Sequence, residues 1–290
     1  MKQDTPAESA PRLDPRAELK EFLRSRRARL KPEDLGLPSY GRRRVPGLRR
    51  EELAQLAGVS FAYYARLEQG YGDSMSAEVL EAVAQALRLT KDERSHLLRL
   101  AQPERRDAPR PRPLMSATHQ HMLDALGVPA YITGWHMDIL GWNRLATAVF
   151  GDWEPLPAEE RNLARLIFLS PQTRERFADP DRTGRVVAAI LRTHVGKNPE
   201  DRRLAALITD LSQRSEEFRR LWARYDVGCE ALGDVVPLRH PLVGEYSLVH
   251  APMILPCDPP LWLLAYHAEP GTPAEEALRL LAGQEPAPRH

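Results

Sequence analysis

The part of the chain that most constrains its fold is Leu48–Gly70, which reads LRREELAQLAGVSFAYYARLEQG. Apolar residues recur at helical spacing and stop at Gly58, a residue that can adopt the left-handed backbone of a tight turn. Ser60 can then cap a second short helix over 61–69, and the last glycine of the stretch can end it. Two short helices joined by so brief a turn predict a helix-turn-helix.

The second helix of such a motif lies in the major groove and presents its outer side chains to base edges. Tyr64 and Leu67 belong to the inner side, and Arg66 suits a phosphate or a guanine. The residues we expect to contact DNA are Arg49, Arg50, Ser60, Phe61, Ala62, Tyr63, Arg66 and Gln69. The alternative is an ordinary helical hairpin in which Arg50 and Arg66 are only solvated.

Basic charge gathers around this motif, although the net charge of the chain is only +1. Lys20 to Arg66 contains 12 basic and 5 acidic residues, which suits a polyanionic partner. Arg42, Arg43 and Arg44 lie before the motif, in a connector that is rich in proline and glycine. This run can follow phosphates or enter the minor groove, or it can be a solvated charge run; the sequence favours neither.

A chain of 290 residues predicts two domains. We expect a disordered leader over 1–15, a helix-turn-helix DNA-binding domain over 16–101, a Pro- and Arg-rich linker over 102–113 and a second domain over 114–290. The sequence has no apolar run of membrane-spanning length, no signal-peptide core and only two cysteines, Cys229 and Cys257. These features favour a cytoplasmic protein with no membrane partner.

Hydrophobic periodicity predicts an all-α first domain and an α+β second domain. In the first domain, helices are expected over 16–31 and 76–87 around the motif, and from Thr90, where Glu93 completes a capping box. The second domain is expected to hold strands at 130–134, 138–142, 235–238, 245–254 and 261–267 in one antiparallel sheet. Its helices are expected over 143–150, 158–169, 171–178, 183–195, 200–225 and 273–281.

The segment RRRVPGLRREELAQLAGVSFAYYARLEQG resembles the DNA-binding domain of XRE-family regulators, the λ-repressor-like fold, and specifically the MmyB-like group of bacterial transcription factors. AYITGWHMDILGWNRLA, SEEFRRLWARYDV and HPLVGEYSLVH resemble that group's PAS-like ligand-binding domain. The resemblance implies a regulator whose DNA affinity depends on a small, apolar, fatty-acid-like molecule. It also implies an ion pair between Glu68 and an arginine of the first helix, which by spacing is Arg26.

A PAS-like sheet covered by helices can enclose an apolar cavity. The candidates for its wall are Trp142, Phe150, Phe168, Leu207, Leu211, Phe218, Trp222, His240, Tyr246 and Leu263. For each of them, packing in an ordinary core is the competing interpretation, because large apolar residues mostly just pack. His240 can be a polar group in the pocket or a hydrogen-bonded structural histidine.

No catalytic or metal site is expected in either domain, and no cofactor other than the effector. His119 and His121 are two residues apart and lie on different faces of a helix, and the other histidines are scattered. The sequence contains neither a phosphate-binding glycine loop nor a G-x-S-x-G motif.

The leading hypothesis is therefore a regulator that binds a double-stranded operator as a homodimer, since one such motif contacts few bases. A DNA-tethered protein-interaction module without a small-molecule pocket is the alternative. An enzyme with a DNA-binding appendage is the third.

Overall fold

The computed structural model describes residues 14–35, 47–102, 114–228, 233–256 and 259–283. The chain divides into two compact units. The first contains Met1–Asp107, Ala189–Asp210 and Trp222–Gly228, and the second contains Ala108–Ala188, Leu211–Leu221 and Cys229–His290. Helices α10 (Pro180–Lys197) and α11 (Arg202–Arg214) contribute residues to both units. Within the described ranges, no helix is both long and apolar enough to cross a membrane.

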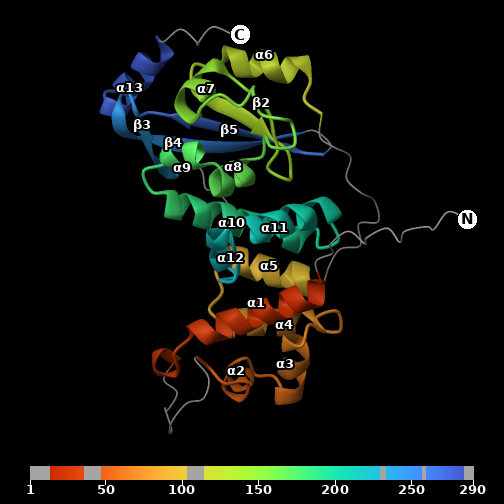
Figure 1. The fold of residues 1–290 in the computed structure, drawn as a ribbon. Coiled ribbons are helices and arrows are strands. Elements are labelled where there is room, and N and C mark those ends of the chain that lie inside the picture. The colour runs from red at the N-terminus through yellow and green to blue at the C-terminus, as the bar shows by residue number, and fades with distance from the viewer. Residues whose placement is uncertain (1–13, 36–46, 103–113, 229–232, 257–258, 284–290) are drawn as a thin grey trace, which may run out of the picture. The chain divides into compact units, whose positions relative to one another are not determined.

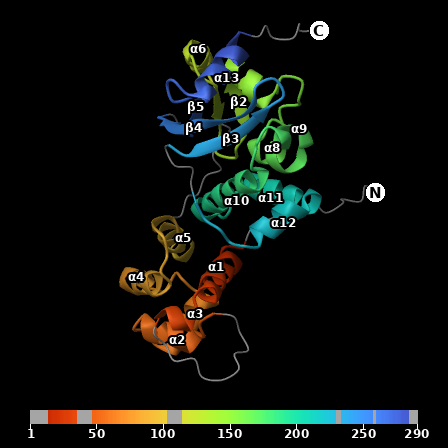
Figure 2. The ribbon, with the colours of Figure 1, turned by 90° about the vertical axis from the view of Figure 1, so that its left-hand side faces the viewer.

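The amino-terminal part of the first unit is helical, as expected. Its elements are α1 (Pro15–Arg29), the 3-10 turn η1 (Pro32–Leu35), α2 (Arg50–Leu56), α3 (Phe61–Glu68), α4 (Ala77–Ala86) and α5 (Lys91–Ala101). Helix α1 contacts α5 and α3, and Figure 2 shows it beside the α4–α5 pair and above the α2–α3 hairpin. A buried apolar core unites these helices, and it includes Phe22, Leu53, Tyr64, Leu80 and Leu97.

The turn between α2 and α3 has the geometry that its sequence predicts. Gly58 has a φ of +66°, and the amide of Val59 donates to the carbonyl of Ala54 at 3.0 Å. Ser60 caps α3 by accepting from the amide of Tyr63 at 3.2 Å. The Thr90 capping box is also present.

The second unit is built on one five-stranded antiparallel sheet of order β2-β1-β5-β4-β3, and its expected PAS-like α+β class is confirmed. The strands are β1 (Ala130–Thr133), β2 (Ile139–Trp142), β3 (Val235–His240), β4 (Gly244–Leu255) and β5 (Leu261–His267). Sequence-distant strands meet at the centre, where Tyr131 of β1 pairs with Leu264 of β5. The helices that belong wholly to this unit are α6 (Ala117–Ala125), α7 (Arg144–Phe150), α8 (Leu163–Leu169), α9 (Pro171–Glu175) and α13 (Pro273–Ala282). Helix α12 (Glu216–Trp222) belongs to it except for its last residue.

The two faces of the sheet have different characters because successive side chains of a strand alternate. One face packs Ile132, Leu261, Leu263 and Ala265 around Leu123 of α6. The other face is aromatic, since Tyr131 and Tyr266 stack there at a ring distance of 5.9 Å and share a 2.9 Å hydrogen bond between hydroxyls. Figure 1 shows α6 and α13 above the sheet and α8 and α9 below it.

The helices between β2 and β3 differ from the sequence prediction in two places. The helix expected over 158–169 begins only at Leu163, because the side chain of Asn162 caps it there. The helix expected over 200–225 is broken at Ser215, whose hydroxyl accepts from the amide of Phe218 at 3.1 Å and starts α12. A cap ends helical periodicity without changing the apolar pattern, so periodicity alone runs through it. The prediction also omitted α6.

Candidate nucleic-acid interface and ligand pocket

The outer side of α3 is open to solvent, as a DNA-reading helix requires. Ser60, Ala62, Arg66 and Gln69 are exposed, and Phe61 keeps 48% of its surface accessible. Tyr63 is half-buried, and its hydroxyl donates to the carbonyl of Ser74 at 3.3 Å, which limits the freedom of the ring. These side chains offer aromatic, methyl, hydroxyl, amide and guanidinium groups along one helix face, which is the chemistry of base-edge contacts.

The inner side of α3 is fixed by one buried carboxylate. Glu68 accepts from Nε and Nη2 of Arg27 at 2.9 Å each, from Nε of Arg50 at 2.8 Å and from the hydroxyl of Tyr64 at 2.7 Å. Burial acts to raise the pKa of Glu68, but the hydrogen bonds from Arg27, Tyr64 and Arg50 outweigh it and lower the pKa. The charged carboxylate therefore ties α1, α2 and α3 together.

The expected pairing of Arg26 with Glu68 is wrong by one residue. Arg26 instead pairs with Glu93 of α5 at 2.8 Å, and its neighbour Arg27 holds Glu68. Successive residues of a helix point about 100° apart, so only one of the two can face α3. Spacing along the sequence does not decide which.

The remaining basic candidates differ in what they are free to do. Arg49 is exposed at the start of α2. Arg50 is 46% exposed but uses Nε to hold Glu68, so it combines a structural bond with an accessible guanidinium edge. Arg42, Arg43 and Arg44 lie outside the described residues, and their proposed contact with DNA stays a prediction.

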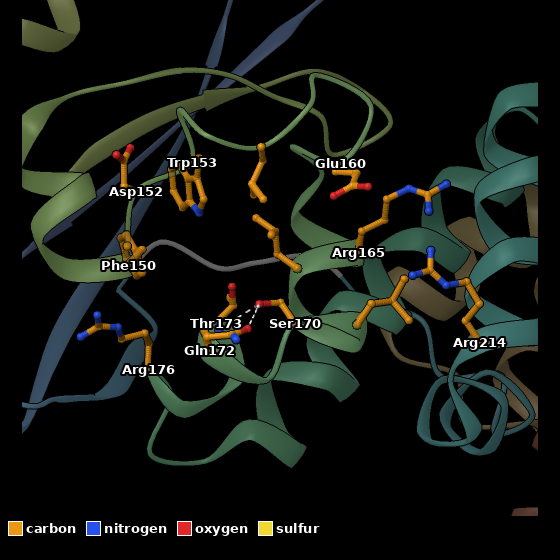
Figure 3. Close-up of a pocket in the computed structure, with 14 residues that line it drawn as sticks. Phe150, Asp152, Trp153, Glu160, Arg165, Ser170, Gln172, Thr173, Arg176 and Arg214 are labelled. Atoms are coloured by element: carbon orange, nitrogen blue, oxygen red, sulfur yellow. Dashed lines mark hydrogen bonds between the residues drawn. The ribbon is translucent and has the colours of Figure 1, made fainter. Parts of the chain in front are cut away.

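The second unit contains a pocket of about 450 Å³ between α7, α8, α9 and the loop that follows α7. Its wall combines aromatic and aliphatic groups with polar and charged ones. The lining residues are Phe150, Gly151, Asp152, Trp153, Leu156, Glu160, Arg165, Leu166, Leu169, Ser170, Gln172, Thr173, Arg176 and Arg214. In Figure 3, Phe150 and Arg176 lie at one end of the pocket, and Arg165, Arg214 and Glu160 lie at the other.

Two of the lining residues carry a buried polar atom without a partner among the described residues. Trp153 is 3% exposed and lines the pocket, yet its Nε1 has no hydrogen-bond partner among the described residues. The same holds for Nη1 of Arg176. A buried donor without an acceptor is costly, so each of these two donors would be stabilised by an acceptor oxygen.

The ten residues predicted for the pocket wall are distributed over several places. Phe150 lines the pocket, and Trp142 contacts the ring of Trp153 at 5.5 Å. Phe168 and Phe218 form an edge-to-face pair at 5.0 Å, and Leu211 is fully buried.

The other predicted wall residues lie elsewhere. Leu207 and Trp222 belong to the first unit, and Leu263 packs with α6 on the opposite face of the sheet. His240 and Tyr246 are buried, and burial is the main cause that lowers the pKa of His240 and raises that of Tyr246 to about 12; the charge of Arg176 acts on both side chains.

The prediction from sequence missed several residues that the structure brings together. Neither periodicity nor a motif distinguishes Arg27, Trp153 and Arg176 from the other arginines and tryptophans of the chain. Among the described residues, no group of three or more His, Cys, Asp or Glu side chains is arranged to hold a metal ion.

Comparison with known families bears on both sites. Residues 115–281 match the family described as MmyB-like transcription regulator ligand binding domain, and residues 18–97 match a helix-turn-helix domain. The chain belongs to the MmyB-like regulator family. The MmyB-like match contains the whole sheet and pocket, and the helix-turn-helix match contains α2 and α3. No curated protein matches the chain. The protein is thus a DNA-binding transcription regulator with a ligand-binding domain.

Proposed function

We propose that this regulator reads a specific operator through the outer side of α3 and that a fatty-acid-like anion in the pocket modulates its affinity for that operator. The observation that carries the proposal is the arrangement of α3. Phe61, Arg66 and Gln69 are exposed, whereas Tyr64 and Glu68 on the opposite side are locked into the helical core. A rigidly held helix with an open, chemically mixed face is suited to sequence recognition.

Selection of bound duplexes from a random pool with purified full-length protein tests the DNA-reading part. A sequence motif is expected, and Phe61→Ala and Arg66→Ala should change it at particular positions, at a cost of about 1–3 kcal/mol for each lost base contact. Lys91→Ala, on α5 outside the helix-turn-helix, is the matched control. If no sequence is enriched, or if both variants weaken binding equally on every duplex, the assignment of these residues to sequence reading fails.

Neutralising Arg42, Arg43 and Arg44 together should act differently. Contacts to phosphates release counterions and carry no sequence information, so their loss should reduce the salt dependence of binding without altering the selected motif. The slope of log affinity against log salt concentration is the measurement. An unchanged slope would favour the solvated charge run.

The pocket supports an amphiphilic anion as the effector. Its volume of about 450 Å³ falls in the range usual for small-molecule sites. Phe150, Leu166 and Leu169 supply apolar surface for a chain. Nε1 of Trp153 and Nη1 of Arg176 have no acceptor among the described residues, and both donors are suited to a carboxylate. Such a ligand can change DNA binding only by favouring one of two states of the protein that differ in operator affinity.

Native mass spectrometry of protein purified from cells, followed by thermal shift with dodecanoate, tests this part. Dodecanoate should raise the melting temperature of the wild type, and Arg176→Met should reduce that rise. Arg239→Met is the control, because Arg239 is exposed, pairs with Glu245 and does not line the pocket. A strictly apo spectrum, with no thermal shift across a panel of lipids, would favour the protein-interaction module instead.

A homodimer is part of the proposal because one helix-turn-helix contacts few base pairs, and two half-sites raise both affinity and selectivity. A selected motif with two inverted half-sites, together with a dimer mass in solution, would support it. A single unrepeated half-site bound by a monomer would contradict it.

A further inference from the structure

Part of the sequence that matches the ligand-binding domain lies in the same compact unit as the helix-turn-helix. Residues Ala189–Asp210 and Trp222–Gly228 fall within the MmyB-like match, yet they belong to the unit that contains α1 to α5. The partly buried side chains of Tyr225 and Val227 pack against the helical core of that unit. The contacts of these two segments with α1 and α5 are specific and largely buried.

Arg192 of α10 is the centre of these contacts. Its side chain is only 1% exposed and forms an ion pair with Glu18 of α1, whose side chain is 9% exposed. The guanidinium carbon lies 3.8 Å from the ring centre of Trp222 and 4.0 Å from that of Tyr225, and Nη2 donates to the carbonyl of Trp222 at 2.6 Å. A buried guanidinium held by a carboxylate and two aromatic faces has little freedom to move.

Two further arginines of α1 extend the contact along the helix. Arg26 donates to the carbonyl of Tyr225, and its burial is the main cause that lowers its pKa to about 10. Arg29 donates to the carbonyl of Arg224 at 2.7 Å and to Oδ1 of Asp226 at 2.6 Å. Trp222–Gly228 is therefore bonded to the last two turns of α1.

Close packing of α10 against α5 adds to this attachment. His96 is fully buried, and a Cβ atom placed on Gly196 would come within 2.3 Å of its Nδ1. Only glycine permits this approach of α10 to α5. Arg192, Gly196 and Trp222–Gly228 together thus cover the side of α1 and α5 that carries Glu18, Arg26 and His96.

The same helix α1 holds the DNA-reading helix. Arg27 follows Arg26 directly and makes the two 2.9 Å bonds to Glu68 of α3. Any shift of α1 must move Arg27 and so change the position of α3, because a buried bidentate ion pair tolerates little displacement.

We infer that Arg192 is a positioning residue for DNA recognition: with Trp222–Gly228 it fixes α1, and α1 fixes α3 through Arg27 and Glu68. The inference rests on the proposed reading of DNA by α3. Residues that match the ligand-binding domain are thereby part of the unit that reads DNA. Helix α11 begins in this unit at Arg202 and ends with the pocket residue Arg214.

The test measures the affinity of full-length protein, without effector, for its selected operator and for a random duplex. Arg192→Met should weaken operator binding about five- to tenfold, within the range of ordinary coupling between sites. Random-duplex binding depends on surface charge that this variant leaves in place, so the ratio of the two affinities should fall. A purely structural defect would lower both affinities alike and leave the ratio unchanged, which would overturn the inference.

Three further variants keep the test decisive even if Arg192→Met does not fold. Arg192→Lys keeps the charge and should restore most of the ratio. Glu18→Gln should lower the ratio by itself and add little to Arg192→Met, because both remove the same ion pair. Asp226→Asn, at a partly exposed side chain, should lower the ratio to a smaller extent; full wild-type ratios in both Glu18→Gln and Asp226→Asn would refute the inference.

Arg174→Met is the matched control. Arg174 is also ion-paired, with Glu217 and Asp181, but its side chain is 33% exposed, it lies in the second unit and it does not line the pocket. The ratio of operator affinity to random-duplex affinity in this variant should equal that of the wild type. If wild-type protein enriches no operator at all, the proposed function fails, and this result is distinct from an unchanged ratio in the Arg192 variants.

Discussion

Removal of the Glu68 carboxylate should loosen the DNA-reading helix far more than removal of a surface ion pair. In Glu68→Ala, Nε and Nη2 of Arg27, whose side chain is only 10% exposed, and the buried hydroxyl of Tyr64 lose their acceptor. Breaking a buried pair by removing one partner costs about 3–5 kcal/mol. Arg50, whose side chain is 46% exposed, can turn to water and adds little to this loss.

Amide hydrogen exchange measured by mass spectrometry resolves this effect locally, which matters because a protein of two units need not unfold in one step. Since each 1.4 kcal/mol corresponds to a factor of ten, exchange in peptides from α1 and α3 should accelerate by roughly two to three and a half orders of magnitude. Peptides from the sheet of the second unit should be unaffected. Glu81→Ala is the control, because Glu81 pairs with Arg94 at 2.6 Å on a much more exposed surface, where a pair contributes about 1 kcal/mol or less.

The pH dependence of the same measurement follows from the pKa of Glu68. Burial raises this pKa, but the hydrogen bonds lower it below the ordinary value of 4.5 in the folded protein. The carboxylate therefore contributes its full stabilisation above about pH 4.5, and the contribution is lost as the pH falls through the folded pKa. Equal acceleration in Glu68→Ala and Glu81→Ala, or a Glu68→Ala variant with the acid sensitivity of the wild type, would refute this account of how α3 is held.

Three further predictions concern the same unit. Gly58→Ala should lower the free energy of unfolding, measured by urea titration, by about 1–2 kcal/mol, because its φ of +66° is strained for alanine although no atom lies within 4 Å of the added Cβ. Gly127→Ala, at an equally open site without this backbone conformation, should leave the free energy of unfolding nearly unchanged in the same titration. Ser60→Ala should cost about 1 kcal/mol by removing the cap of α3, and a cost near zero would mean that the cap does not stabilise the helix. His96 is buried among the charges of Arg192, Arg99 and Arg26, and burial first and these charges second hold its pKa well below 6.5. His96 therefore binds a proton in the unfolded chain but not in the folded unit, so stability should fall as the pH drops below about 6.5. His96→Leu should flatten the plot of urea midpoint against pH in this range. An unchanged slope in the variant would show that His96 does not cause the loss of stability.

The sequence alone determined the local features of the DNA-reading motif. The glycine turn at Gly58, the cap at Ser60, the capping box at Thr90 and the inward side of α3 all depend on residues a few positions apart. Short-range steric and hydrogen-bonding preferences decide such features, so the features can be predicted from one sequence. The five strands were predictable for the same reason, since alternation and turn residues are local.

Only the tertiary structure decided which distant residues meet. It selected Arg27 over Arg26 as the partner of Glu68, placed Trp153 and Arg176 at the pocket, and put Leu263 on the opposite face of the sheet. It also joined Arg192 to Glu18 across more than 170 residues of sequence. Such pairings depend on helix rotation and on strand order, which are set by the packing of the whole unit. A pattern along one segment of the chain therefore does not predict them.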